Sequence, residues 1–203
     1  MGNLLSVKRG FEHCGADVKI LSDPEAILAS SRVVLPGVGA FRDGMAELNR
    51  HGLNEVVLEI VKQGKPLLGI CLGMQMLFDR SEEFGVTEGL GLIPGDVVSI
   101  PTLSDDSKKI KIPHIGWNSL GMPPGVESWK DTLLADINVG EAVYFVHSFM
   151  AKTKDQKNLR ATCLYEDKLI TSVVDRKNVY GCQFHPEKSG EVGLKVLQRF
   201  LKL

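Results

Sequence analysis

The sequence lacks the features that mark several broad classes of protein. Its formal net charge is only −1, and no basic cluster could neutralise many phosphates, which argues against a nucleic acid as partner. No stretch approaches the roughly 20 consecutive apolar residues that span a bilayer, and no signal peptide opens the chain. Internal repeats, low-complexity tracts and linkers are also missing. We therefore expect a single domain over residues 1–203 that has no membrane or nucleic-acid partner.

Cysteine is sparse, and its placement excludes a familiar kind of metal site. The chain has four cysteines, Cys14, Cys71, Cys163 and Cys182, and no two of them form the C-x-x-C pair that is typical of zinc ligands. No metal site is predicted. Without a secretory signal the four side chains are expected to be reduced thiols, so the predicted location is cytoplasmic.

The first part of the chain alternates between helical and strand-like segments. Helices are predicted over residues 4–15, 24–29, 41–49 and 53–63, the first capped by Asn3 and the second by Asp23. Strands are predicted over residues 18–21, 32–35 and 66–70. This alternation predicts a parallel sheet with helices on both faces.

The pattern changes near Asp96. Strand-like segments follow at residues 97–100, 110–120, 142–149, 159–165, 169–175 and 179–184, and a helix beginning at Ser189 closes the chain. These segments add a mixed sheet in the second half. The predicted fold is therefore α/β, with a central, mostly parallel mixed sheet flanked by helices.

Cys71 is the candidate nucleophile. Residues 69–73 are Gly-Ile-Cys-Leu-Gly, and they follow an apolar strand and precede an apolar helix. This is the layout of a nucleophile elbow, with cysteine in place of serine. Gly69 and Gly73 would relieve crowding where the turn is tightest. The amino end of the following helix would favour the thiolate form of the exposed cysteine.

A cysteine nucleophile needs a base, and residues 185–187, His-Pro-Glu, offer both a base and a group to orient it. The proline favours an extended His185, and in extended chain residues i and i+2 project to the same side, so Glu187 could hold the imidazole. Alone, such a tripeptide is more often a surface turn. At the end of a predicted strand, and together with the elbow, the catalytic interpretation is favoured.

Residues 36–39, Pro-Gly-Val-Gly, follow another predicted strand. Ligands of such folds bind at the carboxyl edge of the sheet, and the glycines would let backbone N–H groups point inward. On its own this sequence is more often just a turn. Beside Cys71, we expect the N–H groups of Val38 and Leu72 to form an oxyanion hole.

These motifs resemble those of the class I, or triad, glutamine amidotransferases, through residues 69–75 and 183–187. Within that family, residues 89–95, 113–118, 144–148 and 185–189 are similar to the glutaminase subunits of imidazole glycerol phosphate synthases, of histidine biosynthesis. The resemblance covers essentially the whole chain, in order and without large insertions.

The resemblance implies an enzyme that hydrolyses glutamine to glutamate and ammonia without a cofactor. The triad would be Cys71, His185 and Glu187. Residues implied to hold the substrate L-glutamine are Gly37, Gln75, Glu83 and the backbone of Ser148 and Phe149.

The ammonia would pass to a (β/α)₈-barrel cyclase subunit in a heterodimer. Residues implied to lie at that interface are Asn3, Pro113, His114, Trp117, Asn118 and Lys188. Without the motif, Trp117 could equally be a core aromatic.

The sequence departs from the family pattern at its start. Members normally open with a strand, whereas Met1 begins where that strand should already have ended, so the first strand of the family is expected to be missing. Our hypothesis is that a native start lies upstream, and the intact mass of the protein from its own cells would test it. Phe149 also replaces the usual tyrosine, and Ile115 the commoner methionine.

Three other functions remain open from the sequence. The same glutaminase could serve another acceptor, as a paralogue feeding a nucleotide-sugar or amidino-sugar synthase. It could be a stand-alone cysteine hydrolase of γ-glutamyl bonds, which would need no partner. A non-catalytic regulatory or scaffolding subunit is disfavoured, since Cys71, His185 and Glu187 are all present.

Overall fold

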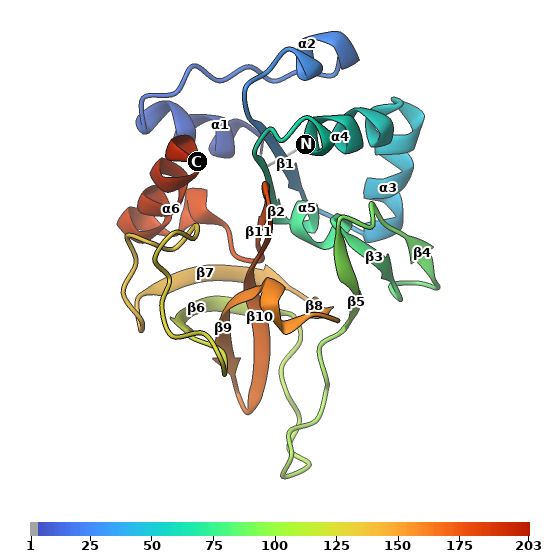
Figure 1. Ribbon diagram of the computed structural model, residues 1–203. Helices are drawn as coiled ribbons and strands as arrows, with labels where there is room; N and C mark the ends of the chain where they lie inside the picture. Colours follow the sequence, from blue (N-terminus) through green and yellow to red (C-terminus); the bar gives the residue numbers. More distant parts are fainter. Residues whose placement is uncertain (1–3) are drawn as a thin grey trace.

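The computed structural model describes residues 4–203, which form two β-sheets and the helices around them (Figure 1). Asn3 lies outside the described residues, and so do its predicted roles as a helix cap and as an interface residue.

The larger sheet has seven strands in the order β1-β2-β11-β10-β9-β6-β7. Their bounds are Val33–Gly37 (β1), Leu67–Cys71 (β2), Val179–Cys182 (β11), Lys168–Arg176 (β10), Leu159–Tyr165 (β9), His114–Gly121 (β6) and Ala142–His147 (β7). The α/β class with a mixed central sheet is confirmed. Parallel pairing, however, joins only β1, β2 and β11, and the remaining neighbours are antiparallel. The turns between β9, β10 and β11 are too short for the crossover that parallel neighbours need.

A second sheet of four strands has the order β4-β3-β5-β8. Its members are Thr87–Glu88 (β4), Phe78–Ser81 (β3), Ile93–Ser99 (β5) and Phe149–Thr153 (β8). The sequence did not predict β3 or β4, which are short and largely polar. β8 also extends to Thr153, beyond the predicted strand over residues 142–149, because β5 pairs with it from Ser99 to Gly95.

Helices cover both faces of the larger sheet, as predicted (Figure 1). The helices are α1 (Leu4–His13), α2 (Pro24–Leu28), α3 (Phe41–Arg50), α4 (Leu53–Lys62), α5 (Leu72–Met76) and α6 (Gly190–Lys202), with 3₁₀ turns at Gln156–Asn158 (η1) and Pro186–Lys188 (η2). Side chains alternate along β2: Leu68 packs with α1 and α6, and Leu67 with α3 and α4. Asp23 caps α2 as expected, accepting from Ala26 N at 2.8 Å.

The predicted strand at residues 18–21 does not form. Within residues 4–203, no strand pairs with the outer side of β1, so β1 is an edge strand and all its residues are only half-buried. A strand needs a partner for its backbone hydrogen bonds, and Ile20 is instead 50% exposed in coil.

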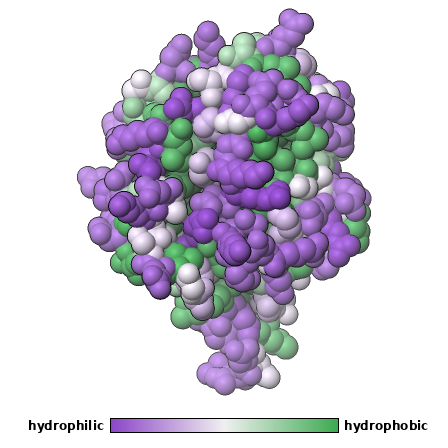
Figure 2. Space-filling view, viewed as in Figure 1, coloured by the Kyte–Doolittle hydropathy of each residue, from purple (hydrophilic) through white to green (hydrophobic). Residues whose placement is uncertain are grey.

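The face seen in Figure 2 is mostly hydrophilic, with hydrophobic residues in small groups between charged ones. Among residues 4–203, no helix combines the length and the apolar character needed to cross a membrane.

Candidate active site

Cys71 stands at the junction of β2 and α5 in a conformation that non-glycine residues rarely adopt. Its φ is 54° and its ψ is −111°. The parallel pairing of β1 with β2 places Gly37 beside it. The predicted strand, sharp turn and helix are therefore present, and the turn is a strained elbow. Cys71 itself is buried, 7% exposed, and not exposed as predicted.

The glycines on either side of Cys71 allow this turn to pack closely. A Cβ on Gly73 would lie 1.7 Å from the carbonyl oxygen of Leu35, and one on Gly69 would lie 2.7 Å from the backbone of Gly73. Neither gap could hold a methyl group. The prediction that both glycines relieve crowding is thus supported by their surroundings.

His185 and Glu187 form a buried pair, with 2.8 Å between Nδ1 and Oε1 and with side chains 2% and 0% exposed. His185 is extended, as predicted, but Pro186–Lys188 is a 3₁₀ turn, so the contact arises from that turn rather than from an extended tripeptide. Backbone bonds fix the histidine further: its N–H donates to Tyr144 O, and its carbonyl accepts from Ser189 Oγ.

His185 carries a positive charge at neutral pH. Burial alone would lower its pKa, but hydrogen bonds to Cys71 and Glu187, together with their negative charges, outweigh burial and raise the pKa of His185 to about 9. The charge beside Cys71 is therefore an imidazolium. The positive end of α5, which was also expected to favour the thiolate form of Cys71, has a smaller effect than His185 because α5 has only five residues.

The predicted oxyanion donors flank the nucleophile. Val38 directly follows β1 and is 50% exposed, whereas Leu72 is the first residue of α5 and is buried. Gly39 has a φ of 100°, a conformation that glycine adopts without strain, and so lets the chain turn after Val38. Donation by these two N–H groups to a bound substrate remains a prediction.

The predicted glutamine-binding residues lie on either side of the elbow. Gln75, in α5, uses both hydrogens of its amide nitrogen, donating to Phe149 O and to Gln183 Oε1 at 3.0 Å each. It could therefore meet a substrate only through its own Oε1, as an acceptor. The carbonyl of Ser148 accepts from Ile100 N, so the backbone there would bind substrate through N–H groups. These roles remain predictions.

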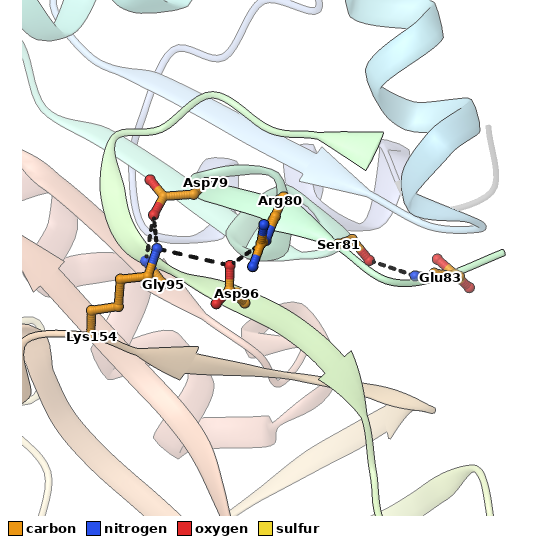
Figure 3. A network of polar contacts seen from close by, with 7 residues as sticks. All are labelled: Asp79, Arg80, Ser81, Glu83, Gly95, Asp96 and Lys154. Carbon is orange, nitrogen blue, oxygen red and sulfur yellow. Dashed lines mark hydrogen bonds and ion pairs between the residues drawn. The ribbon is translucent and has the colours of Figure 1, made fainter. Parts of the chain in front are cut away.

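Glu83, also a predicted glutamine-binding residue, contacts the start of α3. Its Oε2 accepts from Phe41 N at 2.7 Å, at the start of α3, where Ala40 supplies no side-chain cap. Ser81 Oγ accepts from Glu83 N and orients this turn, beside the ion pairs Asp79–Lys154 and Arg80–Asp96 of the second sheet (Figure 3). In this structure Glu83 holds the start of α3, next to the loop that contains Val38.

Comparison with known proteins decides the family. The model of class-I glutamine amidotransferases matches residues 2–203. The chain belongs to this family. It is 51% identical to "Imidazole glycerol phosphate synthase subunit HisH 1" of Legionella pneumophila (strain Lens), over all of this chain and 95% of the relative. It is 41% identical to the HisH subunit of Geobacter sulfurreducens, over 98% of this chain and 93% of the relative.

Solved structures agree on the fold. A crystal structure of a glutamine amidotransferase aligns with a TM-score of 0.73 at 16% identity, covering 99% of this chain and 93% of the other. The glutaminase domain of Trypanosoma brucei CTPS with bound acivicin aligns with a TM-score of 0.62 at 17% identity, covering 99% and 89%. The class-I glutamine amidotransferase fold is thereby confirmed.

Two buried residues of this glutamine amidotransferase site were not among the sequence candidates. Gln183 is fully buried, and its Nε2 lies 3.7 Å from Cys71 Sγ. His147 is 7% exposed, and its Nδ1 contacts Phe149 O at 2.8 Å. A signal for Gln183 was present, since it is a polar residue between the apolar Cys182 and Phe184. His147 lies in the family-like segment over residues 144–148, but nothing in that segment marked it as a residue of the site.

The predicted interface residues divide between surface and interior. Trp117 is 56% exposed on β6 and Lys188 is exposed at η2, so Trp117 is not a core aromatic. Pro113 and Asn118 are half-buried. His114 is only 1% exposed and stacks on Tyr165, and Asn118 Nδ2 donates to it. In this conformation His114 could support the surface from beneath but could not touch a partner.

All four cysteines are free thiols. In the described part of the chain, no group of three or more His, Cys, Asp or Glu side chains is arranged to hold a metal ion.

Proposed function

We propose that this chain is the glutaminase subunit of an imidazole glycerol phosphate synthase. It would hydrolyse glutamine and deliver the ammonia to a partner subunit in histidine biosynthesis. The observation that carries the proposal is the buried His185–Glu187 pair, in which the imidazole of His185 also hydrogen-bonds to Cys71. The full-length identity of 41–51% to relatives named as HisH supports the pathway.

The first half of the reaction uses Cys71 and His185 in turn. The thiolate sulfur attacks the side-chain amide carbon of glutamine, a C–S bond forms, and the carbonyl electron pair moves to oxygen. N–H groups of Val38 and Leu72 would bind that oxyanion. When the C–N bond breaks, His185 gives its Nε2 proton to the leaving nitrogen, which departs as ammonia.

The second half regenerates the thiolate. His185, now neutral, takes a proton from water as the water oxygen attacks the γ-glutamyl thioester. The C–S bond then breaks, glutamate leaves, and the sulfur again faces an imidazolium. Glu187 keeps the ring oriented and stabilises its charge at both stages through the 2.8 Å bond to Nδ1.

The partner we propose is a (β/α)₈-barrel cyclase subunit that binds over β6 and η2. Ile115 and Trp117 project from β6 into solvent, 55% and 56% exposed, and Lys188 is exposed at η2. An exposed tryptophan with a neighbouring aliphatic side chain is the composition expected of an interface centre. We also propose that the protein is located in the cytoplasm. Its free thiols support this, because thiols stay reduced in that compartment.

The test is glutamate release from glutamine, with and without the cyclase barrel of the same organism carrying its nucleotide ligand. Strong stimulation by the loaded barrel is expected. Cys71→Ala should abolish glutamine-dependent turnover, a loss of at least about 10³-fold, because the nucleophile is removed. The same complex should still work with added ammonium salt, since the barrel is intact.

Other outcomes would assign other functions. A barrel that is active on ammonia but does not stimulate glutamate release would favour the paralogue serving a sugar synthase. Full activity of the chain alone would favour the stand-alone γ-glutamyl hydrolase. Glutaminase activity retained by Cys71→Ala would contradict the mechanism itself.

A further inference from the structure

A line of buried hydrogen bonds runs behind Cys71, and a single backbone carbonyl sets its direction. Phe149 O can only accept, so the group that meets it at 3.0 Å must be the amide nitrogen of Gln75. The second hydrogen of that nitrogen points to Gln183, which must therefore present its Oε1, again at 3.0 Å. The amide nitrogen of Gln183 is left facing the other way, 3.7 Å from Cys71 Sγ.

We propose that Gln183 is a further catalytic residue, whose side-chain N–H donates to the sulfur of Cys71 and favours the thiolate. This rests on the proposed glutaminase function, because only a reaction that uses Cys71 as nucleophile needs the thiolate. Gln183 is fully buried, so its donor is not shared with solvent.

A competing contact of the same sulfur explains why such a donor is useful. Cys71 Sγ also lies 3.9 Å from Val146 O. As a thiol the sulfur can donate to this carbonyl, but as a thiolate it would face a carbonyl dipole of the wrong sign. The N–H of Gln183 and the imidazolium of His185 act in the opposite direction and stabilise the negative sulfur.

The Phe149 carbonyl that sets this direction is itself held from a second side. His147 Nδ1 donates to it at 2.8 Å, His147 Nε2 lies 2.9 Å from His114 Nδ1, and Asn118 Nδ2 donates to His114 Nε2. Burial lowers the pKa of His114 to about 4 and that of His147 to about 3. Both rings are therefore neutral at pH 7, and each has one donor and one acceptor, as the line of bonds requires.

The experiment measures the thiol directly. Alkylation of Cys71 by iodoacetamide is followed against pH in the full chain, with the site of modification assigned by peptide mass spectrometry. Cys71→Ala supplies the background from the other cysteines. Gln183→Leu removes the donor, and Gln183→Glu keeps an acceptor for Gln75 but places a carboxylate oxygen beside the sulfur.

The expected result is slower alkylation near neutral pH, on the order of tenfold for Gln183→Leu, which is what the loss of a hydrogen bond to a charged group produces. The pH of half-maximal alkylation should move upward, and further in Gln183→Glu than in Gln183→Leu. With the partner present, kcat for glutamine should fall more than KM rises, because the nucleophile rather than the substrate pocket is altered.

Ser172→Ala is the matched control. Ser172 is also fully buried, and its carbonyl accepts from Gln183 N, but its hydroxyl bonds to Ile170 O and not to Cys71. It should leave the alkylation profile unchanged. If Gln183→Leu fails to fold, Gln183→Glu and Gln75→Met can be measured in the same way. Gln75→Met removes the hydrogen bond that orients the Gln183 amide, so the amide nitrogen no longer has to face Cys71.

An alkylation profile of the folded Gln183 variants that superimposes on the wild type would overturn the proposal, whatever happens to turnover. The readout needs neither the partner nor the ammonia acceptor. A failure of the pathway assignment would therefore leave this result standing, and the two can be told apart.

Discussion

At Cys71 the backbone is held in a strained conformation by its neighbours. The positive φ costs on the order of 1–3 kcal/mol in a non-glycine residue, and it persists because β2 pairs with β1 on one side and β11 on the other. The strain points the sulfur out of the sheet toward His185. Close packing beneath the elbow leaves no space for the chain to relax.

The glycine that allows this packing gives a prediction at the same scale. Gly73→Ala should destabilise the fold by at least about 3 kcal/mol. Its Cβ, whose position the backbone fixes, would lie 1.7 Å from Leu35 O, a backbone atom that cannot move aside as a flexible side chain could. Thermal unfolding, or soluble yield where the variant does not accumulate, measures this.

Gly121→Ala is the control, since its Cβ would only touch Thr162 O at 3.7 Å. It should shift the unfolding temperature little. Equal stability of Gly73→Ala and the wild type would mean that the elbow is looser than its geometry indicates.

The candidate site residues could be predicted from the sequence where local spacing marks them. Cys71 between two glycines and His185 two positions before Glu187 are sequence patterns, and the structure brings all three together. Gln183 was missed because its contact with Cys71 spans 112 positions. No local pattern shows which way a buried amide faces.

Among the elements, α3 depends on a residue from elsewhere in the chain. Ala40 at its N-cap offers no acceptor, and Glu83 fills that place from the loop after β3. A carboxylate there satisfies an unpaired N–H and also complements the positive end of the helix. The loop after β1, which contains Val38, runs directly into this end of α3.

Glu83→Ala should therefore destabilise the protein by about 1 kcal/mol even without substrate. Loosening of the loop that contains Val38 should also raise the KM for glutamine. Thermal unfolding of the free protein measures the first effect, and glutaminase kinetics with the partner measure the second.

Glu82→Ala is the matched control, as an exposed neighbour in the same loop. An unchanged unfolding temperature in Glu83→Ala, together with a raised KM, would show that Glu83 acts only on the substrate, as the family resemblance implied.

Residues 18–21 show why a predicted strand can fail to form. Residues 18–21 have the apolar character of a strand, but in the described chain no strand reaches them, and they remain coil. Strand propensity alone does not form a strand, because the hydrogen bonds need a second backbone. The prediction failed for this reason, while the helices, which bond within themselves, were placed to within about two residues.

For the molecule as a whole, three buried histidines act on stability in opposite directions. The pKa values of His114 and His147 are lowered to about 4 and about 3, by burial above all. As pH falls below about 6.5 the unfolded chain takes up these protons and the native state does not, so stability falls. The pKa of His185 is raised to about 9, so its contribution is complete below about 6.5 and is lost as pH rises through 9.

We therefore expect the unfolding temperature to be highest near pH 6.5 and to fall on both sides. His185→Gln should flatten the alkaline side and His147→Gln the acid side, each by about 2–4 °C over the affected range. Differential scanning calorimetry from pH 4 to 9.5 measures the three profiles.

His13→Gln is the control for the two variants, because His13 is exposed on α1. Its profile should follow the wild type. If the unfolding temperature of His185→Gln fell as steeply above pH 6.5 as that of the wild type, protonation of His185 would not contribute to the stability of the folded protein.

The sequence by itself determined the α/β class, the helices and the candidate residues Cys71, His185 and Glu187. These follow from local periodicity, from glycine spacing and from residues two positions apart. Only the tertiary structure decided which strands pair, that β1 forms an edge, that Glu83 caps α3, and that Gln183 faces Cys71. Each of these depends on groups far apart in the chain, and their contacts exist only once the backbone has closed around them.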